Sequence, residues 1–301
     1  MKQNIAIRLL VPLIFALQSG AAAQDPRPAA EGPVLNVQVF GAVADGVTDD
    51  YTAIRAAVAA INAAGGGTLH FPPGTYLIDQ FRTATNGIGI AFSDCDGLTV
   101  DGYGARIVVK GDFHRPADLS ATESSVNSVV PIHLVNCRNF TIQGLEVDGN
   151  AALTSRDPGV IEGPSHGLIT ERCSNYTIRD YYAHNFPGDG IYIGDSSTIS
   201  DRNVLIERVT ARFNARDGIS VISARDGVIR DSVFEYNGWD QGTYPAHEPM
   251  SGINIEASHH GDPDVKTGNW LIEGCTIASN QRSQVQAAGL NKENLTLRQC
   301  T

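Results

Sequence analysis

A short pattern of alternating apolar and polar positions recurs along the chain and predicts β-strands. Each copy has an apolar residue, then often Thr, then a central Ile, Val or Leu, and then a polar residue. The seven copies span residues 98–101, 140–143, 176–179, 204–207, 227–230, 270–273 and 295–298. Strand-length copies that return every few dozen residues are typical of a solenoid, in which coils stack in one dimension.

The last position of each copy is usually charged. These positions hold Asp101, Gln143, Arg179, Glu207, Arg230, Glu273 and Arg298. Opposite charges on neighbouring strands stabilise their pairing. We therefore expect a structural ladder of side chains there, rather than a functional site.

A second apolar position follows the central residue of most coils at a constant interval, as from Ile178 to Ile191 and from Ile206 to Ile219. In two coils the interval is nearly doubled, from Ile142 to Leu168 and from Ile229 to Ile253. Extra loops at 148–166 and 236–250 therefore leave the same corner of the solenoid. Because loops build binding sites on repeat scaffolds, we expect them to form the walls of a groove that seats an extended polymer.

The N-terminus has the pattern of a secretory signal peptide. Lys2 and Arg8 precede an apolar run at 9–17, and Ala21 to Ala23 supply a cleavage site. We predict a signal peptide at 1–23, a linker at 24–36 and one domain at 37–301, in a secreted or periplasmic protein. Loss of Lys2 and Arg8 changes the net charge from −11 to −13. That charge argues against nucleic acid and anionic membranes as partners.

A predicted helix precedes the repeats. Ile54, Ala57, Val58 and Ile61 share one face, Thr48 or Asp49 is the expected N-cap, and Gly65 to Gly67 end the helix. Such a helix covers the open edge of a first coil. The last residues, Cys300 and Thr301, fall in mid-coil, and we expect the sequence to be incomplete at that end.

The segment around this helix resembles the N-terminal segment of the pectate-lyase superfamily. The matching residues are Phe40-Gly41-Ala42, Asp45-Gly46-Val47-Thr48-Asp49-Asp50, Gly65-Gly66-Gly67-Thr68 and Phe71-Pro72-Pro73-Gly74-Thr75-Tyr76, with Tyr51 where the family usually has Thr. The resemblance implies an all-β fold, a single-stranded right-handed parallel β-helix with an N-terminal capping α-helix. The cap would cover 37–80.

The five cysteines fall into two columns once the repeats are aligned. Cys95, Cys137 and Cys173 form one column, and Cys275 and Cys300 form the other. Neighbours on adjacent coils would lie about 5 Å apart, within disulfide range. A Cys275–Cys300 disulfide and a ladder of free thiols both fit the spacing. Neither column has the spacing of a metal site.

The floor of the predicted groove contains two Asp-Gly pairs. We expect His166, Asp189, Asp217 and Ser251 in one outward column, with Tyr192, Ser220, Asn254, Glu171 and Glu256 beside it. Carboxylates of Asp189 and Asp217 about 5 Å apart would repel by about 3 kcal/mol and separate their pKa values. An acid beside an ionised carboxylate suits glycoside cleavage. The alternative is that both Asp-Gly pairs are turn residues.

Three functions remain open. The first, slightly favoured, is a polysaccharide hydrolase with Asp189, Asp217, Glu256 and Arg216 as catalytic residues. The second is a lyase or C5-epimerase on a uronate polymer, with Ca²⁺ as a possible cofactor. Residues 244–248 are loosely similar to the Asp-Pro-His site of alginate epimerases.

The third is a non-catalytic glycan-binding β-helix with stacking aromatics. The predicted substrate-binding residues are His166, Glu171, Tyr192, Ser220, Asn254, Trp239, Tyr244 and His247. No metal ligands are predicted, and Asp262 and Asp264 are assigned to a turn. The sequence gives no indication of the oligomeric state.

Overall fold

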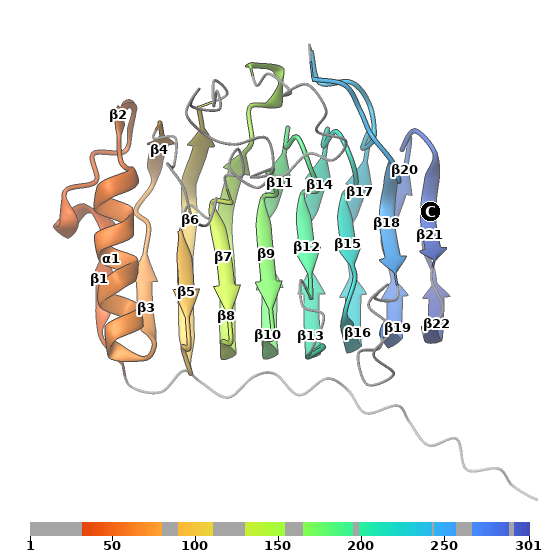
Figure 1. Ribbon diagram of the computed structural model, residues 1–301, viewed down its shortest axis with the longest axis horizontal. Coiled ribbons are helices and arrows are strands. Elements are labelled where there is room, and N and C mark those ends of the chain that lie inside the picture. The colour runs from red at the N-terminus through yellow and green to blue at the C-terminus, as the bar shows by residue number, and fades with distance from the viewer. Residues whose placement is uncertain are drawn as a thin grey trace, which may run out of the picture.

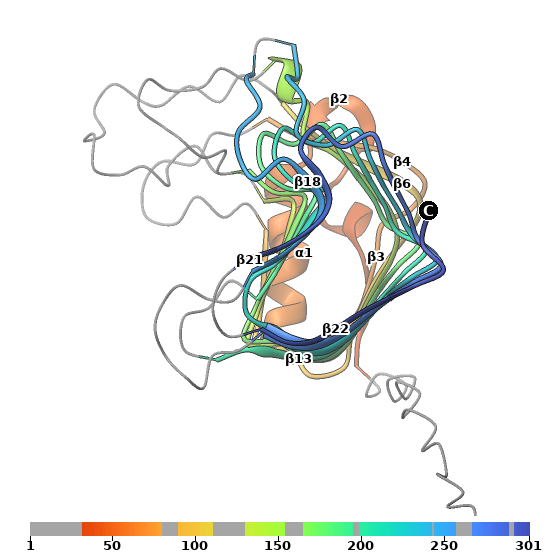
Figure 2. The same ribbon diagram turned by 90° about the vertical axis from the view of Figure 1, so that its right-hand side faces the viewer.

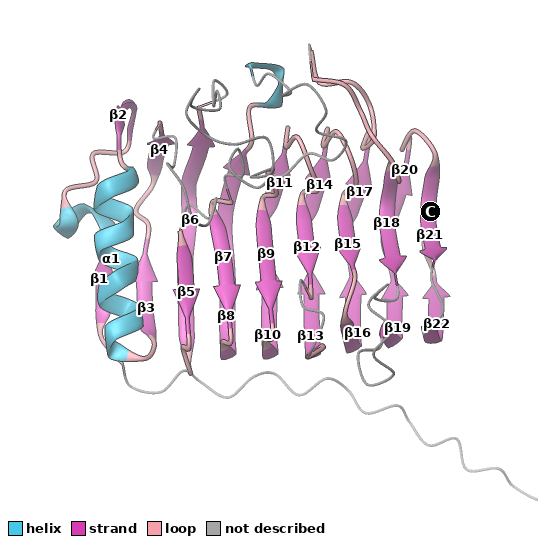
Figure 3. Ribbon diagram, in the orientation of Figure 1, coloured by secondary structure: helices cyan, strands magenta, loops and turns pink. Residues whose placement is uncertain are grey.

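The computed structural model describes residues 32–79, 90–110, 130–153, 165–194, 199–242, 244–256, 267–288 and 292–301. The strands lie side by side along the long axis of the molecule, from a helix at the N-terminal end to the C-terminus at the other (Figure 1). Apart from one α-helix and two short 3-10 helices, the described elements are strands (Figure 3). The predicted all-β solenoid with an N-terminal helix is confirmed. The predicted signal peptide lies outside the described residues.

Two parallel sheets form the coils. The seven-stranded sheet contains β5 (Ala91–Ser93), β7 (Ile132–Val135), β9 (Leu168–Glu171), β12 (Ile191–Ile193), β15 (Ile219–Val221), β18 (Ser251–Glu256) and β21 (Ser283–Ala288). The fifteen-stranded sheet contains β1 (Val34–Asn36), β2 (Asp45–Asp49), β3 (Gly67–His70), β4 (Gly74–Ile78), β6 (Leu98–Val109), β8 (Arg138–Asp148), β10 (Ser174–Arg179), β11 (Tyr182–His184), β13 (Asp201–Glu207), β14 (Thr210–Arg212), β16 (Ala224–Arg230), β17 (Val233–Glu235), β19 (Thr267–Glu273), β20 (Thr276–Ala278) and β22 (Lys292–Arg298). Seen along the solenoid, successive coils superimpose (Figure 2).

The register of the coils follows the spacing of the apolar positions. Leu168 pairs with Ile191, Ile191 with Ile219, and Ile219 with Ile253. All four side chains are completely buried in the core. The predicted constant interval, with longer intervals before Leu168 and Ile253, therefore gives the register of the seven-stranded sheet correctly.

The capping helix α1 (Tyr51–Ala64) packs its predicted face on the first coil. The N-cap position is Asp50, just beyond the predicted Thr48 or Asp49, but the Asp50 side chain makes no capping bond, and the carboxylate of the predicted Asp49 accepts the N–H of Tyr51. The Asp50 carboxylate instead accepts hydrogen bonds from the backbone N–H groups of Val43 and Ala44, and thereby fixes the preceding loop on the helix. Gly65 ends the helix as predicted, in a left-handed conformation that glycine adopts without strain.

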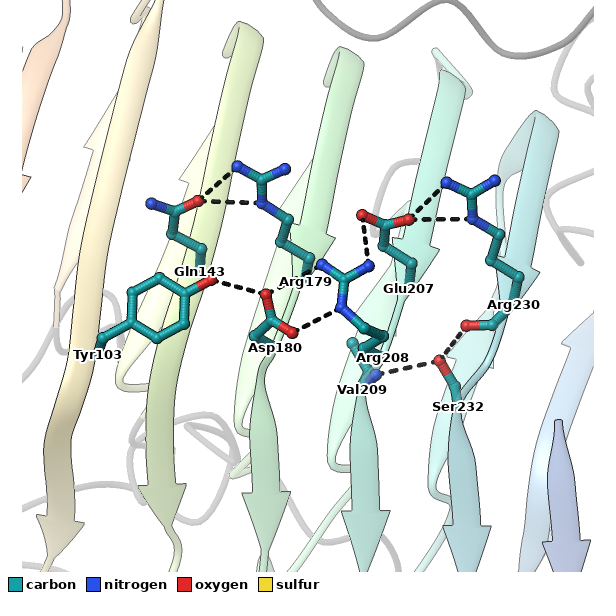
Figure 4. Close-up of polar contacts among 9 residues, drawn as sticks. All are labelled: Tyr103, Gln143, Arg179, Asp180, Glu207, Arg208, Val209, Arg230 and Ser232. Carbon is teal, nitrogen blue, oxygen red and sulfur yellow. Dashed lines mark hydrogen bonds and ion pairs between the residues drawn. The ribbon is translucent and has the colours of Figure 1, made fainter. Parts of the chain in front are cut away.

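The charged column forms the expected ladder on the fifteen-stranded sheet (Figure 4). Arg179 donates to Gln143, and Arg230 donates to Glu207, in each case to a side chain on the preceding coil. One residue further on, Arg208 bonds Asp180, which also accepts the Tyr103 hydroxyl. These contacts join neighbouring coils and assign the column a structural role.

All five cysteines are free thiols, and four of them are buried. Of the two alternatives for Cys275 and Cys300, the structure has the unbonded one. The 3-10 helices are η1 (Val37–Phe40) and η2 (Ala151–Leu153). Within the described parts of the chain, no helix has the length and apolar character needed to span a membrane.

Candidate functional site

The two Asp-Gly pairs lie in turns just before β12 and β15, and both carboxylates are completely buried. Asp189 Oδ1 accepts the backbone N–H of Asp217 at 3.0 Å, and Asp217 Oδ1 accepts that of Ser251 at 2.6 Å. Each aspartate therefore binds the backbone of the next coil. The prediction that this column faces solvent is wrong for Asp189, Asp217 and Ser251, all of which are completely buried.

The remaining carboxylate oxygens are also bound. Arg216 Nη1 donates to Asp189 Oδ2 at 2.8 Å, while Ser220 Oγ and Asn254 Nδ2 donate to Asp217 Oδ2 at 3.0 and 3.3 Å. Burial, followed by the nearby Asp189 charge, raises the pKa of Asp217 well above its usual value, although Arg216 opposes this. Ser220 and Asn254 are themselves buried. The two carboxylates are therefore occupied by groups of the protein and do not reach a glycosidic oxygen of a polysaccharide bound at the surface.

His166 and Tyr192 lie together on the outer side of the seven-stranded sheet. Their ring centroids are 4.9 Å apart, the His166 side chain is 13% exposed, and Tyr192 is half-buried. The backbone N–H of Asp189 donates to His166 Nδ1 at 3.0 Å. Burial is the main cause that lowers the pKa of His166 to about 4. At neutral pH the ring is therefore uncharged, with its proton on Nε2.

The second long loop reaches back to this region. Figure 1 shows the segment between β17 and β18 projecting beyond the neighbouring turns. His247 Nε2 donates to the Pro187 carbonyl at 2.9 Å, and Arg216 Nε donates to the Glu248 carbonyl at 3.1 Å. These bonds anchor the loop beside the turn that carries Asp189. Most of the first long loop, 154–164, lies outside the described residues.

The other predicted residues are dispersed. Trp239 is 48% exposed, whereas Tyr244 is only 2% exposed and packs with Ala151 and Ala215. Tyr244 was predicted to bind substrate as a stacking aromatic, which requires an exposed ring, and its burial contradicts that prediction. Glu256 ends β18, half-buried, and the described residues show no contact between it and either aspartate.

Glu171 ends β9 and faces a histidine that the sequence reasoning missed. His133 Nε2 lies 3.7 Å from a Glu171 carboxylate oxygen, and the His133 ring is buried. Burial lowers the pKa of His133 to about 4. His133 pairs with Ile169, which pairs with Tyr192, so the three residues form one row. The predicted row began at Ile169, and extending it by one coil toward the N-terminus identifies His133.

Metal ligands do not gather in the described parts of the chain. No group of three or more His, Cys, Asp or Glu side chains there is arranged to hold an ion. Asp262 and Asp264 lie outside the described residues.

Two family models match the sequence. One, described as the right handed beta helix region, matches residues 132–301, which is more than half of the chain. The chain belongs to the right-handed β-helix family. The other, described as rhamnogalacturonase A/epimerase, pectate lyase-like, matches residues 34–91, which confirms the resemblance in the cap.

The curated relatives include enzymes of Azotobacter vinelandii. Mannuronan C5-epimerase AlgE6 is 31% identical over 206 residues, or 68% of this chain and 20% of that protein. Alginate lyase 7 is 28% identical over 220 residues, or 64% of this chain and 24% of that protein. The chain thus spans about a quarter or less of either relative. The solved A-module of mannuronan C5-epimerase AlgE4 has a TM-score of 0.52 at 21% identity, covering 88% of this chain and 76% of the module. This last likeness concerns the fold.

Proposed function

We propose that this β-helix modifies a uronate-containing polysaccharide by removing the proton at C5 of a uronate residue. Return of a proton to the opposite face would give the C5 epimer, and loss of the C4 substituent would give chain cleavage by β-elimination. The observation that carries the proposal is the contact between His166 and Tyr192, a pair of proton-transfer groups at the outer side of the sheet. The similarity to an epimerase and a lyase of uronate polymers supports it.

The state of the carboxylates argues against hydrolysis by the aspartate pair. A glycosidase needs two carboxyl groups that reach the scissile bond. Asp189 and Asp217 are fully buried and bound to donors of the protein. The proposal therefore replaces the hydrolase that the sequence slightly favoured with chemistry at C5.

The two rings would have different roles. The neutral His166 can donate a hydrogen bond from Nε2 to the uronate carboxylate, whose negative charge grows as the C5 proton leaves. Tyr192 would carry the proton to or from C5. Asp189 would act as a positioning residue, because its backbone N–H fixes the His166 ring and its carboxylate holds Arg216.

The first test is an assay on alginate, polymannuronate and pectate that follows ultraviolet absorbance of unsaturated uronates, reducing ends and, by proton NMR, the ratio of the two C5 epimers. We expect Tyr192→Phe to lower turnover by at least about 100-fold, the usual contribution of a positioned proton-transfer group. Tyr182→Phe is the matched control, a half-buried tyrosine on the other sheet, and should retain wild-type turnover. Reducing ends that form without absorbance, and survive Tyr192→Phe, would overturn the proposal.

A further inference from the structure

We propose that Phe213, Tyr236 and Trp239, hereafter the aromatic strip, form a stacking subsite for the pyranose rings of a polysaccharide. The inference rests on the proposed function for the class of ligand, and it adds a binding surface beside the proposed reaction site. Phe213 and Tyr236 were not singled out in the sequence.

The strip consists of large apolar side chains that remain in contact with solvent. Phe213 is 41%, Tyr236 45% and Trp239 48% exposed. The Phe213 and Tyr236 rings are stacked, with centroids 5.4 Å apart and planes at 14°. The Trp239 indole N–H donates to the Ser279 carbonyl at 2.9 Å, which anchors this ring on the next coil. The strip therefore extends over successive coils.

Phe213 and Tyr236 occupy a left-handed corner of the coils. Asn185, Phe213, Tyr236 and Ser279 occupy the same corner of successive coils, all at φ between 56° and 58°. Small polar residues such as Asn adopt this left-handed conformation with least strain, and bulky residues rarely do. Two exposed aromatic residues at a strained corner point to a use outside the fold.

Two residues of the strip begin the segments that lead to the candidate site. Phe213 begins the turn that carries Arg216 and Asp217, and Tyr236 begins the long loop that His247 and Glu248 anchor beside Asp189. A polymer running along the solenoid axis meets one coil after another. The C–H face of a pyranose ring packs on aromatic carbon. The adjacent Arg212 is paired with Glu235 at 2.8 Å, so the charges beside the strip are balanced. Stacking, rather than ionic attraction, would then supply the contact.

The test is a double variant, Phe213→Asn with Tyr236→Asn, which places at this corner the residue type already present at Asn185. Binding to alginate and other polysaccharides is measured by affinity electrophoresis, and folding by thermal unfolding. We expect an affinity loss of about tenfold or more, with a Tm equal to or above that of the wild type. Tyr103→Asn, an exposed aromatic on β6, is the control and should bind normally.

Trp239 provides a second readout, because the only other tryptophan, Trp270, is buried. Polymer should shift the emission of the wild type and leave that of Trp239→Phe unchanged. A lower Tm with unchanged affinity would overturn the proposal and make the stack a structural ladder. Binding is measured without turnover. If the aromatic strip contributes to binding as expected but the protein shows no reaction at C5, only the proposed function is refuted. Wild-type protein that binds no polysaccharide would refute both.

Discussion

Three buried aspartates of this solenoid differ in the groups that bind their carboxylates. Asp189 is neutralised by Arg216, while Asp217 lies beside Asp189 and is bound by neutral donors. Asp201 accepts the backbone N–H of Cys173 and the hydroxyl of Tyr176, both at 2.8 Å. Their contributions to stability should therefore differ in size and in pH dependence.

Asp189→Asn should destabilise the protein far more than Asp217→Asn at pH 7. The first change removes the ion-pair partner of Arg216, a largely buried side chain, which costs about 3 kcal/mol or more. The second replaces a carboxyl group that is bound by neutral donors and whose pKa is raised by burial, so an uncharged amide should cost less than about 1 kcal/mol. Urea unfolding of the two variants measures the difference. Equal losses would refute this account of the pair.

Asp201 should make stability fall as pH rises. Burial raises its pKa from 3.8 to about 6, so the folded state disfavours the ionised form. Its stabilising contribution is complete below pH 3.8 and is lost as pH rises through 6. A shift of this size corresponds to about 3 kcal/mol. Asp201→Asn should therefore gain stability relative to wild type between pH 3.5 and pH 7. A difference between the two proteins that stays constant over this range would contradict the assignment.

The positions of Asp189 and Asp217 on successive coils could be predicted from the sequence, but the burial of their side chains could not. The sequence placed Asp189 and Asp217 on successive coils, where the structure has them. Whether an aspartate in a turn points outward or accepts the backbone of the next coil depends on bonds such as that from Ser251, which only the folded chain reveals.

At the scale of elements, α1 illustrates how a cap is attached. The apolar positions Ile54, Ala57, Val58 and Ile61 identified its buried face correctly. The N-cap position lies one residue beyond the predicted Asp49, and Asp49 and Asp50 are both good capping residues. The choice between them is made by tertiary contacts, since Asp50 binds the loop at Val43 and Ala44 while Asp49 accepts the N–H groups of Tyr51 and Asp79.

Asp50→Ala should weaken the attachment of the preceding loop to the capping helix and lower the stability of the protein. Asp50 is 1% exposed, and its loss leaves two part-buried backbone N–H groups without this acceptor, at a cost of about 1–3 kcal/mol. Asp45→Ala is the control, because Asp45 also accepts two backbone N–H groups but is exposed, so that water can replace it. Thermal unfolding should show a clear loss for the first variant and a small one for the second. The reverse order would contradict the role of Asp50.

At the scale of the whole molecule, the repeat made the fold and its register predictable, because every coil must bury the same apolar rows. The surface around the site was less predictable. Tyr244 is buried by a contact within the loops, with Ala151 and Ala215. Phe213 and Tyr236 are exposed because the chain turns through a left-handed corner there, which alternation of side chains does not anticipate. Such positions depend on contacts between loops and coils rather than on the repeat.

Proton removal at C5 of a uronate by this protein is tested most directly in heavy water. The wild-type protein is incubated with polymannuronate in D₂O, and the polymer is examined by proton NMR for loss of the C5–H signal. We expect loss of C5–H, either by exchange for deuterium on epimerisation or by formation of the C4=C5 double bond on elimination, and we expect this loss to require Tyr192 and to be retained in Tyr182→Phe. Cleavage of a uronate polymer with every C5–H intact would contradict it.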